Sequence, residues 1–250
     1  MQALYTAKLG LQVQQQRVNI IGNNLANSQA MAYKSQRVDF KDTLYTAMVN
    51  PNNTQSTANL QQGSGALVSA TPRDFSTGEP EMTDYELDFY LEGDGFFTVS
   101  DGHGGLLYTR NGSFSESGEA DGKYLVTASG NYVLDTNFNR IKLPDHISDL
   151  ESDAAGVLSA NDVTLAALNI VDFPNKDGLE LVGAGCYIQT VATGQPVQSN
   201  AIVRQGVLEA SNVDAALETT RLIRAQRAFS LASRAVSAWN DMTEKAYNLR

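Results

Sequence analysis

Cysteine and histidine are scarce in this 250-residue chain, which contains one cysteine and two histidines. A single cysteine, Cys186, excludes an intramolecular disulfide and any metal site built from several thiolates. Two histidines likewise exclude a histidine-rich catalytic zinc site. No apolar run approaches the roughly 20 residues that a membrane-spanning helix needs, and the N-terminus lacks a signal-peptide pattern. We therefore expect no metal and no membrane-spanning segment.

Glycine and proline are absent from the last 44 residues, 207–250. Ordinary composition would place about five of them there. All six prolines lie between Pro51 and Pro196, and 18 of the 20 glycines lie between Gly63 and Gly206. Because these residues interrupt helices, their distribution indicates helical ends and a centre of a different kind.

Charge is divided in the same way. The net charge of −10 is made of +4 over residues 1–41, −16 over residues 42–210 and +2 over residues 211–250. Acidity of this degree argues against nucleic acid as a partner. The two basic ends are predicted to belong together, apart from the acidic centre.

The N-terminal segment has the periodicity of a helix with an apolar seam. Four residues are spaced seven apart and a fifth lies on the adjoining row, and the set is Leu4, Leu11, Val18, Leu25 and Ile21. The pattern predicts about 23 helical residues, roughly 35 Å long. Asn23, Asn24 and Asn27 are poor helix formers and are expected to end this helix.

The C-terminal segment predicts a longer helix of about 35 residues, roughly 50 Å. Ser211 and Asp214 are read as a capping-box start. The apolar face includes Leu222, Phe229, Leu231, Val236 and Met242. We expect these side chains to pack against the N-terminal seam, within one subunit or between subunits. The alternative is a long helix that packs only on its own domain.

The centre is predicted to divide into an arm and a β domain. Residues 50–84 are polar and rich in turn-forming residues, which indicates an extended arm or linker with one short strand near 66–70. Residues 85–207 alternate short strand candidates, such as 96–99 and 165–173, with turns such as Asn111-Gly112. Strands at this spacing are typical of an all-β sandwich or barrel.

The predicted fold is therefore α+β and multidomain, with a discontinuous, coiled-coil-like helical domain from both termini and an inserted all-β domain. Its expected parts are an N-terminal helical half at 1–49, the arm at 50–84, the β domain at 85–207 and a C-terminal helix at 208–250 that pairs with 1–30.

No catalytic constellation is evident. The chain has no G-x-S-x-G turn, and the Gly-Ala-Gly at 183–185 lacks the third glycine of a dinucleotide loop. Acidic pairs such as Glu79 and Glu81 are more simply explained as a solvated face. We expect no enzyme activity, no cofactor and no small-molecule substrate.

Three blocks of sequence resemble the flagellar rod and hook axial proteins of bacteria, most closely the shorter rod members. They are NIIGNNLANSQAMAYKSQRVDF at 19–40, the stretch 87–134 with GDGFF, YTRNGSF and LVTASGNYV, and the stretch 205–242 with GVLEASNV and AQRAF. The family's turn motif corresponds to Asn23, Asn24, Leu25, Ala26 and Asn27. The Gly-Phe-Lys-like element that follows reads Ala32-Tyr33-Lys34 here, a departure at the glycine.

The resemblance implies a structural subunit of the flagellar basal-body rod that assembles through its terminal helices into a tubular drive shaft. It implies self-association, contact with other rod and hook proteins, location in the basal body, and passage through the flagellar type III export apparatus without a cleaved signal peptide. The family's short export motif, a phenylalanine followed four residues later by an apolar residue, matches Phe40 and Leu44.

Three alternatives remain open at this point. One is a hook or other axial flagellar protein. A second, of a different class, is a cell-wall-acting or carbohydrate-binding β module, which needs a cleft with converging carboxylates. The third is an export chaperone with an ordered helical arm.

Overall fold

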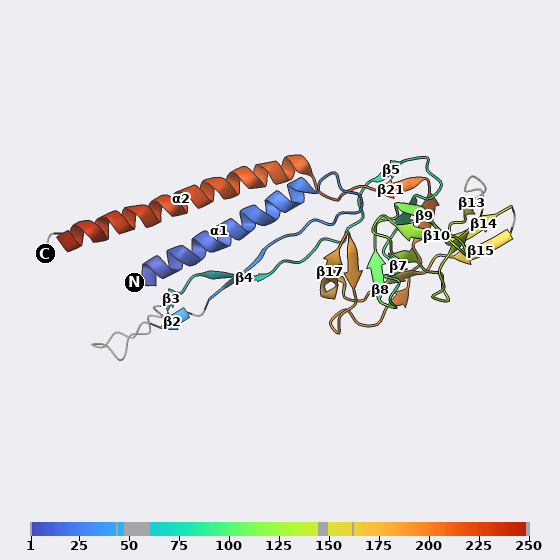
Figure 1. Cartoon of the computed structure of the whole chain (residues 1–250). Helices are drawn as coiled ribbons and strands as arrows, with labels where there is room; N and C mark the ends of the chain where they lie inside the picture. The colour runs from blue at the N-terminus through green and yellow to red at the C-terminus, as the bar shows by residue number, and fades with distance from the viewer. Residues whose placement is uncertain (1, 44, 48–60, 145–149, 162, 249–250) are drawn as a thin grey trace. The chain divides into compact units, whose positions relative to one another are not determined.

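A computed structural model describes residues 2–43, 45–47, 61–144, 150–161 and 163–248 of the chain (Figure 1). It has α+β composition, with two long helices and many short strands. The chain divides into two compact units. The helical unit comprises Met1–Ala26, Gln36–Asp74 and Asp214–Arg250, and the β-rich unit comprises Asn27–Ser35 and Phe75–Val213.

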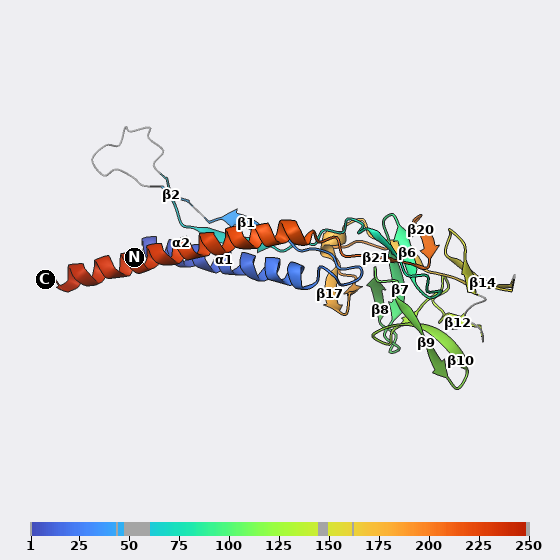
Figure 2. The ribbon, with the colours of Figure 1, turned by 90° about the horizontal axis from the view of Figure 1, so that it is seen from above.

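Two helices of unequal length dominate the helical unit. Helix α1 spans Gln2–Ala26 and helix α2 spans Ala215–Asn248, which are 25 and 34 residues. At 1.5 Å per residue they are about 37 and 51 Å long. They lie side by side and run in opposite directions, so that the C-terminal end of α2 extends beyond the start of α1 (Figures 1 and 2).

The end of α1 differs from the prediction. Asn23 and Asn24 lie inside the helix, which continues to Ala26. Asn24 is buried, and its side-chain amide donates to the Gln36 carbonyl at 2.8 Å while its Oδ1 accepts from the Gln36 backbone N–H at 2.9 Å. The low helix propensity of Asn24 is thus offset by a paired hydrogen bond that no local pattern reveals.

The start of α2 also differs from the prediction. Asp214 caps this helix, because its Oδ1 accepts from the backbone N–H groups of Ala216 at 2.9 Å and Leu217 at 3.0 Å. The Ser211 hydroxyl instead accepts from the Val213 N–H, before the helix begins. Ser211 and Asp214 therefore do not form a capping box.

Two antiparallel ribbons complete the helical unit. Strand β1 (Asp39–Asp42) pairs with β4 (Ala66–Ala70), and β2 (Tyr45–Ala47) pairs with β3 (Gln61–Gly63). The short strand expected near 66–70 is confirmed, whereas residues 48–60 of the expected arm lie outside the described residues. Gly65 lets the ribbon approach α1, since a Cβ there would stand 3.3 Å from Leu9 Cδ1.

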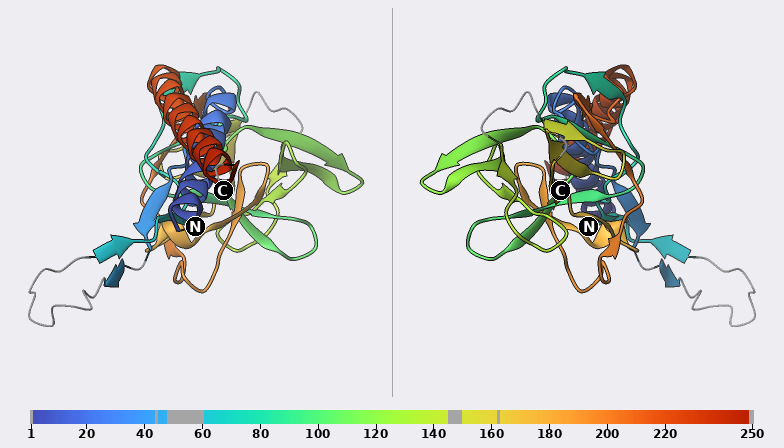
Figure 3. Two further views of the ribbon diagram at one scale, coloured as in Figure 1. Left: turned by 90° about the vertical axis from the view of Figure 1, so that its left-hand side faces the viewer. Right: turned by 90° about the vertical axis from the view of Figure 1, so that its right-hand side faces the viewer.

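A ten-stranded sheet forms the body of the β-rich unit. Its main path has the order β12-β10-β11-β7-β8-β18-β17, with β9 paired to β10 and β16 paired to both β7 and β19. Figure 3 shows the β9–β10 hairpin, in green, projecting from the other strands of this unit. The bounds are β7 Phe96–Ser100, β8 Leu106–Thr109, β9 Phe114–Glu119, β10 Gly122–Thr127, β11 Tyr132–Val133, β12 Lys142–Leu143, β16 Ile170–Asp172, β17 Glu180–Gly183, β18 Cys186–Ile188 and β19 Val197–Gln198.

Smaller sheets surround this body. A three-stranded sheet has the order β13-β14-β15, and two further pairs are β20 with β6 and β21 with β5. Their bounds are β5 Pro80–Met82, β6 Phe89–Glu92, β13 Leu150–Ser152, β14 Val157–Ala160, β15 Val163–Ala167, β20 Ile202–Gln205 and β21 Val207–Glu209, and a short 3₁₀ helix spans Lys176–Gly178.

One predicted strand divides in the structure. Residues 165–173 belong to β15 and β16, because Leu168 and Asn169 turn between them and both are buried. The polar strand β9, FSESGE, had no apolar alternation to reveal it. The core of the unit combines aliphatic residues with Phe89, Phe97 and Phe114, and a second cluster packs Phe96 edge-to-face on Phe173.

The predicted turn at Asn111-Gly112 leads to a first testable consequence. A Cβ at Gly112 would lie 1.8 Å from the Phe89 carbonyl oxygen, so Gly112→Ala must displace backbone and should lower the free energy of unfolding by about 3 kcal/mol. Urea unfolding followed by near-ultraviolet circular dichroism measures the loss. Gly118→Ala is the matched control, since nothing lies within 4 Å of its Cβ position, and equal stability of the two variants would contradict the packing.

Candidate functional site

The predicted seam of α1 is only partly covered within the chain. Ile21 is buried, while Leu11, Val18 and Leu25 are half-buried. The side chain of Leu4 lies outside the described residues. The fully covered positions of α1 also include Val13, eight residues before Ile21, which is the spacing of one face of an ordinary helix.

The apolar residues of α2 separate into two adjacent rows. Leu222, Phe229 and Val236, spaced seven apart, are half-covered, and Ala225 beside them is buried. Leu231 and Met242, in contrast, are 65% and 59% exposed. Ala235 and Ala238 lie on the same exposed row. The chain therefore covers one row of α2 and leaves the second open to solvent.

The two short motifs have different positions. Asn23, Asn24, Leu25 and Ala26 form the last turn of α1, and the Asn27 carbonyl accepts from Ala30 N–H in the turn that follows. Phe40 is 43% exposed on β1. Leu44 lies outside the described residues.

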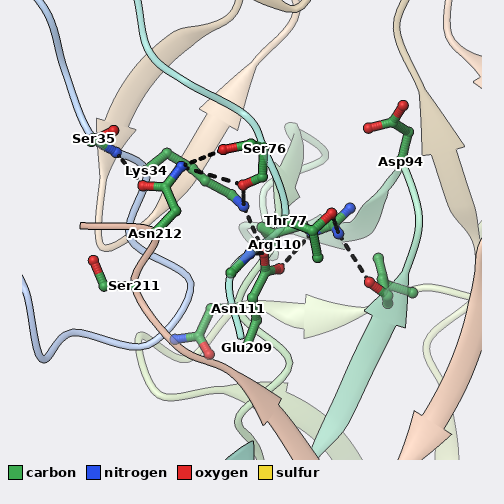
Figure 4. Close-up of polar contacts among 12 residues, drawn as sticks. Lys34, Ser35, Ser76, Thr77, Asp94, Arg110, Asn111, Glu209, Ser211 and Asn212 are labelled. Carbon is green, nitrogen blue, oxygen red and sulfur yellow. Dashed lines mark hydrogen bonds and ion pairs between the residues drawn. The ribbon is translucent and has the colours of Figure 1, made fainter. Parts of the chain in front are cut away.

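The β-rich unit contains a buried charged cluster, defined here as Lys34, Arg110 and Glu209 (Figure 4). Their side chains are 1%, 4% and 2% exposed. Glu209 Oε1 lies 2.6 Å from Lys34 Nζ, and Oε2 lies 2.6 Å from Arg110 Nε. Oε1 also accepts from the Gly78 backbone N–H at 2.7 Å. One carboxylate thus binds two cations away from water.

Arg110 uses the rest of its guanidinium to hold a turn of the main chain. Nη1 donates to the Gly95 carbonyl at 2.6 Å, and Nη2 donates to the carbonyls of Leu91 at 2.9 Å and Gly93 at 2.6 Å. These carbonyls belong to the turn between β6 and β7. The planar fork of arginine suits this task, because it supplies five donors in a fixed geometry.

Lys34 connects the cluster to the segment that precedes β5. Its Nζ donates to the Ser76 carbonyl at 2.7 Å as well as to Glu209. Beside it, Asn212 Oδ1 accepts from the Ser35 N–H at 2.8 Å (Figure 4). Residues 34, 76, 110 and 209 are far apart in sequence, so the cluster ties together segments that no local interaction would hold.

The sequence analysis did not single out these three residues. Each nevertheless lies in a block that carried the family resemblance, Lys34 in AYKS, Arg110 in YTRNGSF and Glu209 in GVLEASNV. A charged residue inside an otherwise apolar or turn-forming motif was the available signal. Only the fold shows that the three charges meet.

Ala32 adopts a left-handed backbone conformation next to the cluster. Its φ is +56°, and its N–H donates to the Glu209 carbonyl at 2.7 Å. This is the position at which the sequence departs from the glycine of the resembling element. Alanine can occupy the left-handed region at a cost of about 1–2 kcal/mol relative to the right-handed one.

An acidic groove of about 450 Å³ lies elsewhere on the β-rich unit, lined in part by Glu92, Asp94 and Asp172. Lys176 Nζ lies 2.7 Å from Asp94 Oδ1 and 3.4 Å from Asp172 Oδ1. The hydrogen bond from Lys176 holds the pKa of Asp94 below its usual value. Asp94 is therefore ionised at neutral pH and cannot donate a proton in glycosidic-bond cleavage.

The remaining chemistry-bearing groups are also quiet. Burial raises the pKa of the Cys186 thiol, which keeps it protonated and unreactive at neutral pH. Among the described residues, no group of three histidine, cysteine or acidic side chains could hold a metal ion. No helix in the described part of the chain has the length and apolar character needed to span a membrane.

Comparison with known families finds three matches along the chain. Residues 4–29 match the family described as flagella basal body rod protein, residues 90–160 match the flagellar hook protein FlgE/F/G D1 domain, and residues 204–249 match the flagellar basal body rod FlgEFG protein C-terminal family. Arg110 and Glu209 lie within the second and third ranges.

Whole-length relatives agree with these matches. The chain is 32% identical over 266 residues to the flagellar basal-body rod protein FlgG of Buchnera aphidicola (subspecies Acyrthosiphon pisum), covering 99% of both chains. It is 33% identical over 266 residues to FlgG of Borreliella burgdorferi, covering 100% of this chain and 99% of the relative. It is 34% identical over 260 residues to FlgG of Agrobacterium fabrum, covering 97% of both.

The charged cluster generates a second prediction. Glu209→Gln should lower the free energy of unfolding of the β-rich unit by about 3–5 kcal/mol, because two buried cations lose their counter-charge. Urea titration monitored by near-ultraviolet circular dichroism measures it. Glu116→Gln removes an exposed ion pair with Lys123 and should cost less than about 1 kcal/mol. A Glu209→Gln variant as stable as this control would sink the assigned role.

The backbone of Ala32 generates a third prediction. Ala32→Gly should raise the free energy of unfolding by about 0.5–1 kcal/mol, since glycine occupies the left-handed region without steric cost. The same urea titration measures the gain. Ala30→Gly is the control in the same turn; Ala30 has no positive φ, so its substitution should give no gain. Loss of stability in Ala32→Gly would contradict the left-handed assignment.

Proposed function

The chain belongs to the flagellar basal-body rod proteins, and from this membership we propose that its paired terminal helices are the polymerising part of the subunit. The protein is a structural subunit of the rod and a component of the flagellar basal body. The observation that carries the proposal is the second apolar row of α2, which stays exposed in the single chain.

The two rows of α2 support a division of labour. Leu222, Phe229 and Val236 are covered within the subunit, so they stabilise the α1–α2 pair. Leu231 and Met242 each leave an apolar side chain in water, and covering one fully is worth about 1.5–3 kcal/mol. Small residues on the same row, Ala235 and Ala238, allow a helix of another copy to approach closely. The exposed row is the face for neighbouring subunits.

Contacts of this kind build a tube when they do not close. The covered and exposed rows are different surfaces, so a neighbour that packs on the exposed row makes a heterologous contact, and repeated heterologous contacts produce helical filaments. The partners are further copies of this chain and other rod and hook proteins. A tube of interlocked helices transmits torque, because a twist is resisted at every contact.

The proposed domain division follows from the same argument. A discontinuous helical domain, residues 1–49 with 208–250, carries the coiled-coil-like assembly helices, residues 50–84 form an arm, and residues 85–207 form an inserted all-β domain. The structure refines the last boundary, since the β-rich unit also includes Asn27–Ser35 and Phe75–Val213.

The β domain has a structural, non-enzymatic role in this proposal. Its acidic groove contains carboxylates that are paired with Lys176, and Glu92 is paired with Arg204. A cell-wall hydrolase of the rival class would need one carboxyl group that is protonated near neutral pH. The charged cluster, which is fully buried, stabilises the unit and is not placed to meet a substrate.

Export through the flagellar type III apparatus completes the proposal. Phe40 is available for recognition, because it is exposed on a two-stranded ribbon of the kind that is marginally stable in water. The second residue of the proposed export motif, Leu44, lies outside the described residues.

The assembly face generates a fourth prediction. Leu231→Glu combined with Met242→Glu should leave the free chain folded, because both side chains are already exposed, but should reduce incorporation into basal bodies at least tenfold. The measurement is the amount of the variant in basal bodies isolated from cells that express no other copy. Ser237→Glu, an exposed polar position off this row, is the matched control and should incorporate normally. Normal rods from the double variant would contradict the proposed face.

A further inference from the structure

The charges of the two helices are distributed unevenly along their length. Helix α1 has two cations, Lys8 and Arg17, and no acid. Helix α2 has four arginines between residues 221 and 234 and no acid between 219 and 240. Its late acids, Asp241 and Glu244, lie near its C-terminal end. The centre of α2 therefore has no anionic partner on α1.

Four exposed charges of α2 have no ion pair among the described residues. They form two pairs with the same internal spacing of three, Arg224 with Arg227 and Asp241 with Glu244. The fourth arginine of the early group that could compete, Arg221, is already bound to Glu218. The offset between the two pairs is 17 residues for both members, which is about 26 Å along a helix.

The ends of the helices leave room for a neighbour at this offset. The C-terminal end of α2 extends past the start of α1, so Asp241 and Glu244 lie on the part of α2 that α1 does not accompany (Figures 1 and 2). The basic pair borders a shallow groove on α2 that includes Ile223, Arg227 and Leu231. A second helix seated there would cover Leu231 of the exposed row.

We propose that the α2 helices of neighbouring copies lie parallel with a stagger of 17 residues, so that Asp241 and Glu244 of one copy pair with Arg224 and Arg227 of the next. The proposal rests on the proposed function and specifies its interface. Both pairs have opposite charges at this register, and no like charges stand opposite one another. Exposed pairs are individually weak, but the contact recurs at every subunit.

Other registers satisfy the charges less well. An antiparallel pairing would also match both pairs, but it would set Arg234 opposite itself and would close a dimer instead of extending a filament. A parallel stagger of 20 residues would set Asp241 opposite Arg221, which Glu218 already binds. A stagger of 10 residues would place Arg234 against Arg224.

Charge reversal tests the pairing in intact rods. Arg224→Glu with Arg227→Glu, and separately Asp241→Arg with Glu244→Arg, should each reduce incorporation into isolated basal bodies at least tenfold. The chain with all four reversals should recover to within about twofold of the original. Co-expression of the two double variants should also restore rods, since each supplies the charge that the other needs. Absence of rescue in both experiments would overturn the proposal.

Cross-linking tests the register independently of charge. Arg224→Cys with Asp241→Cys should form disulfide-linked multimers in assembled rods, because cysteines at this stagger face one another across copies. The native Cys186 is buried and does not interfere. Multimers from Arg221→Cys with Asp241→Cys instead would indicate the 20-residue register and refute ours. If Leu231→Glu with Met242→Glu still formed rods, the helix face itself would be wrong, so the two failures are distinguishable.

Discussion

The buried Glu209 carboxylate is the interaction on which the β-rich unit depends. Removing three charged groups from water is expensive, and their attraction offsets this cost only when every remaining donor and acceptor is bonded. That condition is met, since Lys34 reaches a carbonyl, Arg110 reaches three, and Glu209 also accepts from a backbone N–H. The cluster therefore acts as a specificity device: it forms only when segments from residues 34, 76–78, 91–110 and 209 arrive together.

The helical unit is built on the opposite condition. Its long helix has two apolar rows and a single chain can cover only one of them. Its charges are also unmatched along much of their length, with Arg224 and Arg227 lacking acids on either helix within reach. A unit of this kind reaches its lowest free energy only beside copies of itself, which is what a rod subunit requires.

The sequence predicted what depends on local pattern and failed where distant residues meet. Helical periodicity identified α1 and α2, and the turn and apolar pattern identified β4 and most strands of the ten-stranded sheet. The last turn of α1 was misplaced because Asn24 is stabilised by Gln36, 12 residues away. Lys34, Arg110 and Glu209 were missed for the same reason, since their spacing along the chain has no periodicity to read.

The polar groups buried in the helical unit explain why that unit is the softer one. Gln14 Oε1 and Glu218 Oε2 are buried and have no hydrogen-bond donor among the described residues, and each such acceptor costs about 1–3 kcal/mol. The charged cluster has no atom in this state. Since the covered row of α2 consists mainly of half-buried side chains, it offsets such costs only in part. Stability that the isolated helices lack is then supplied at assembly, where the second row and the unpaired charges become buried.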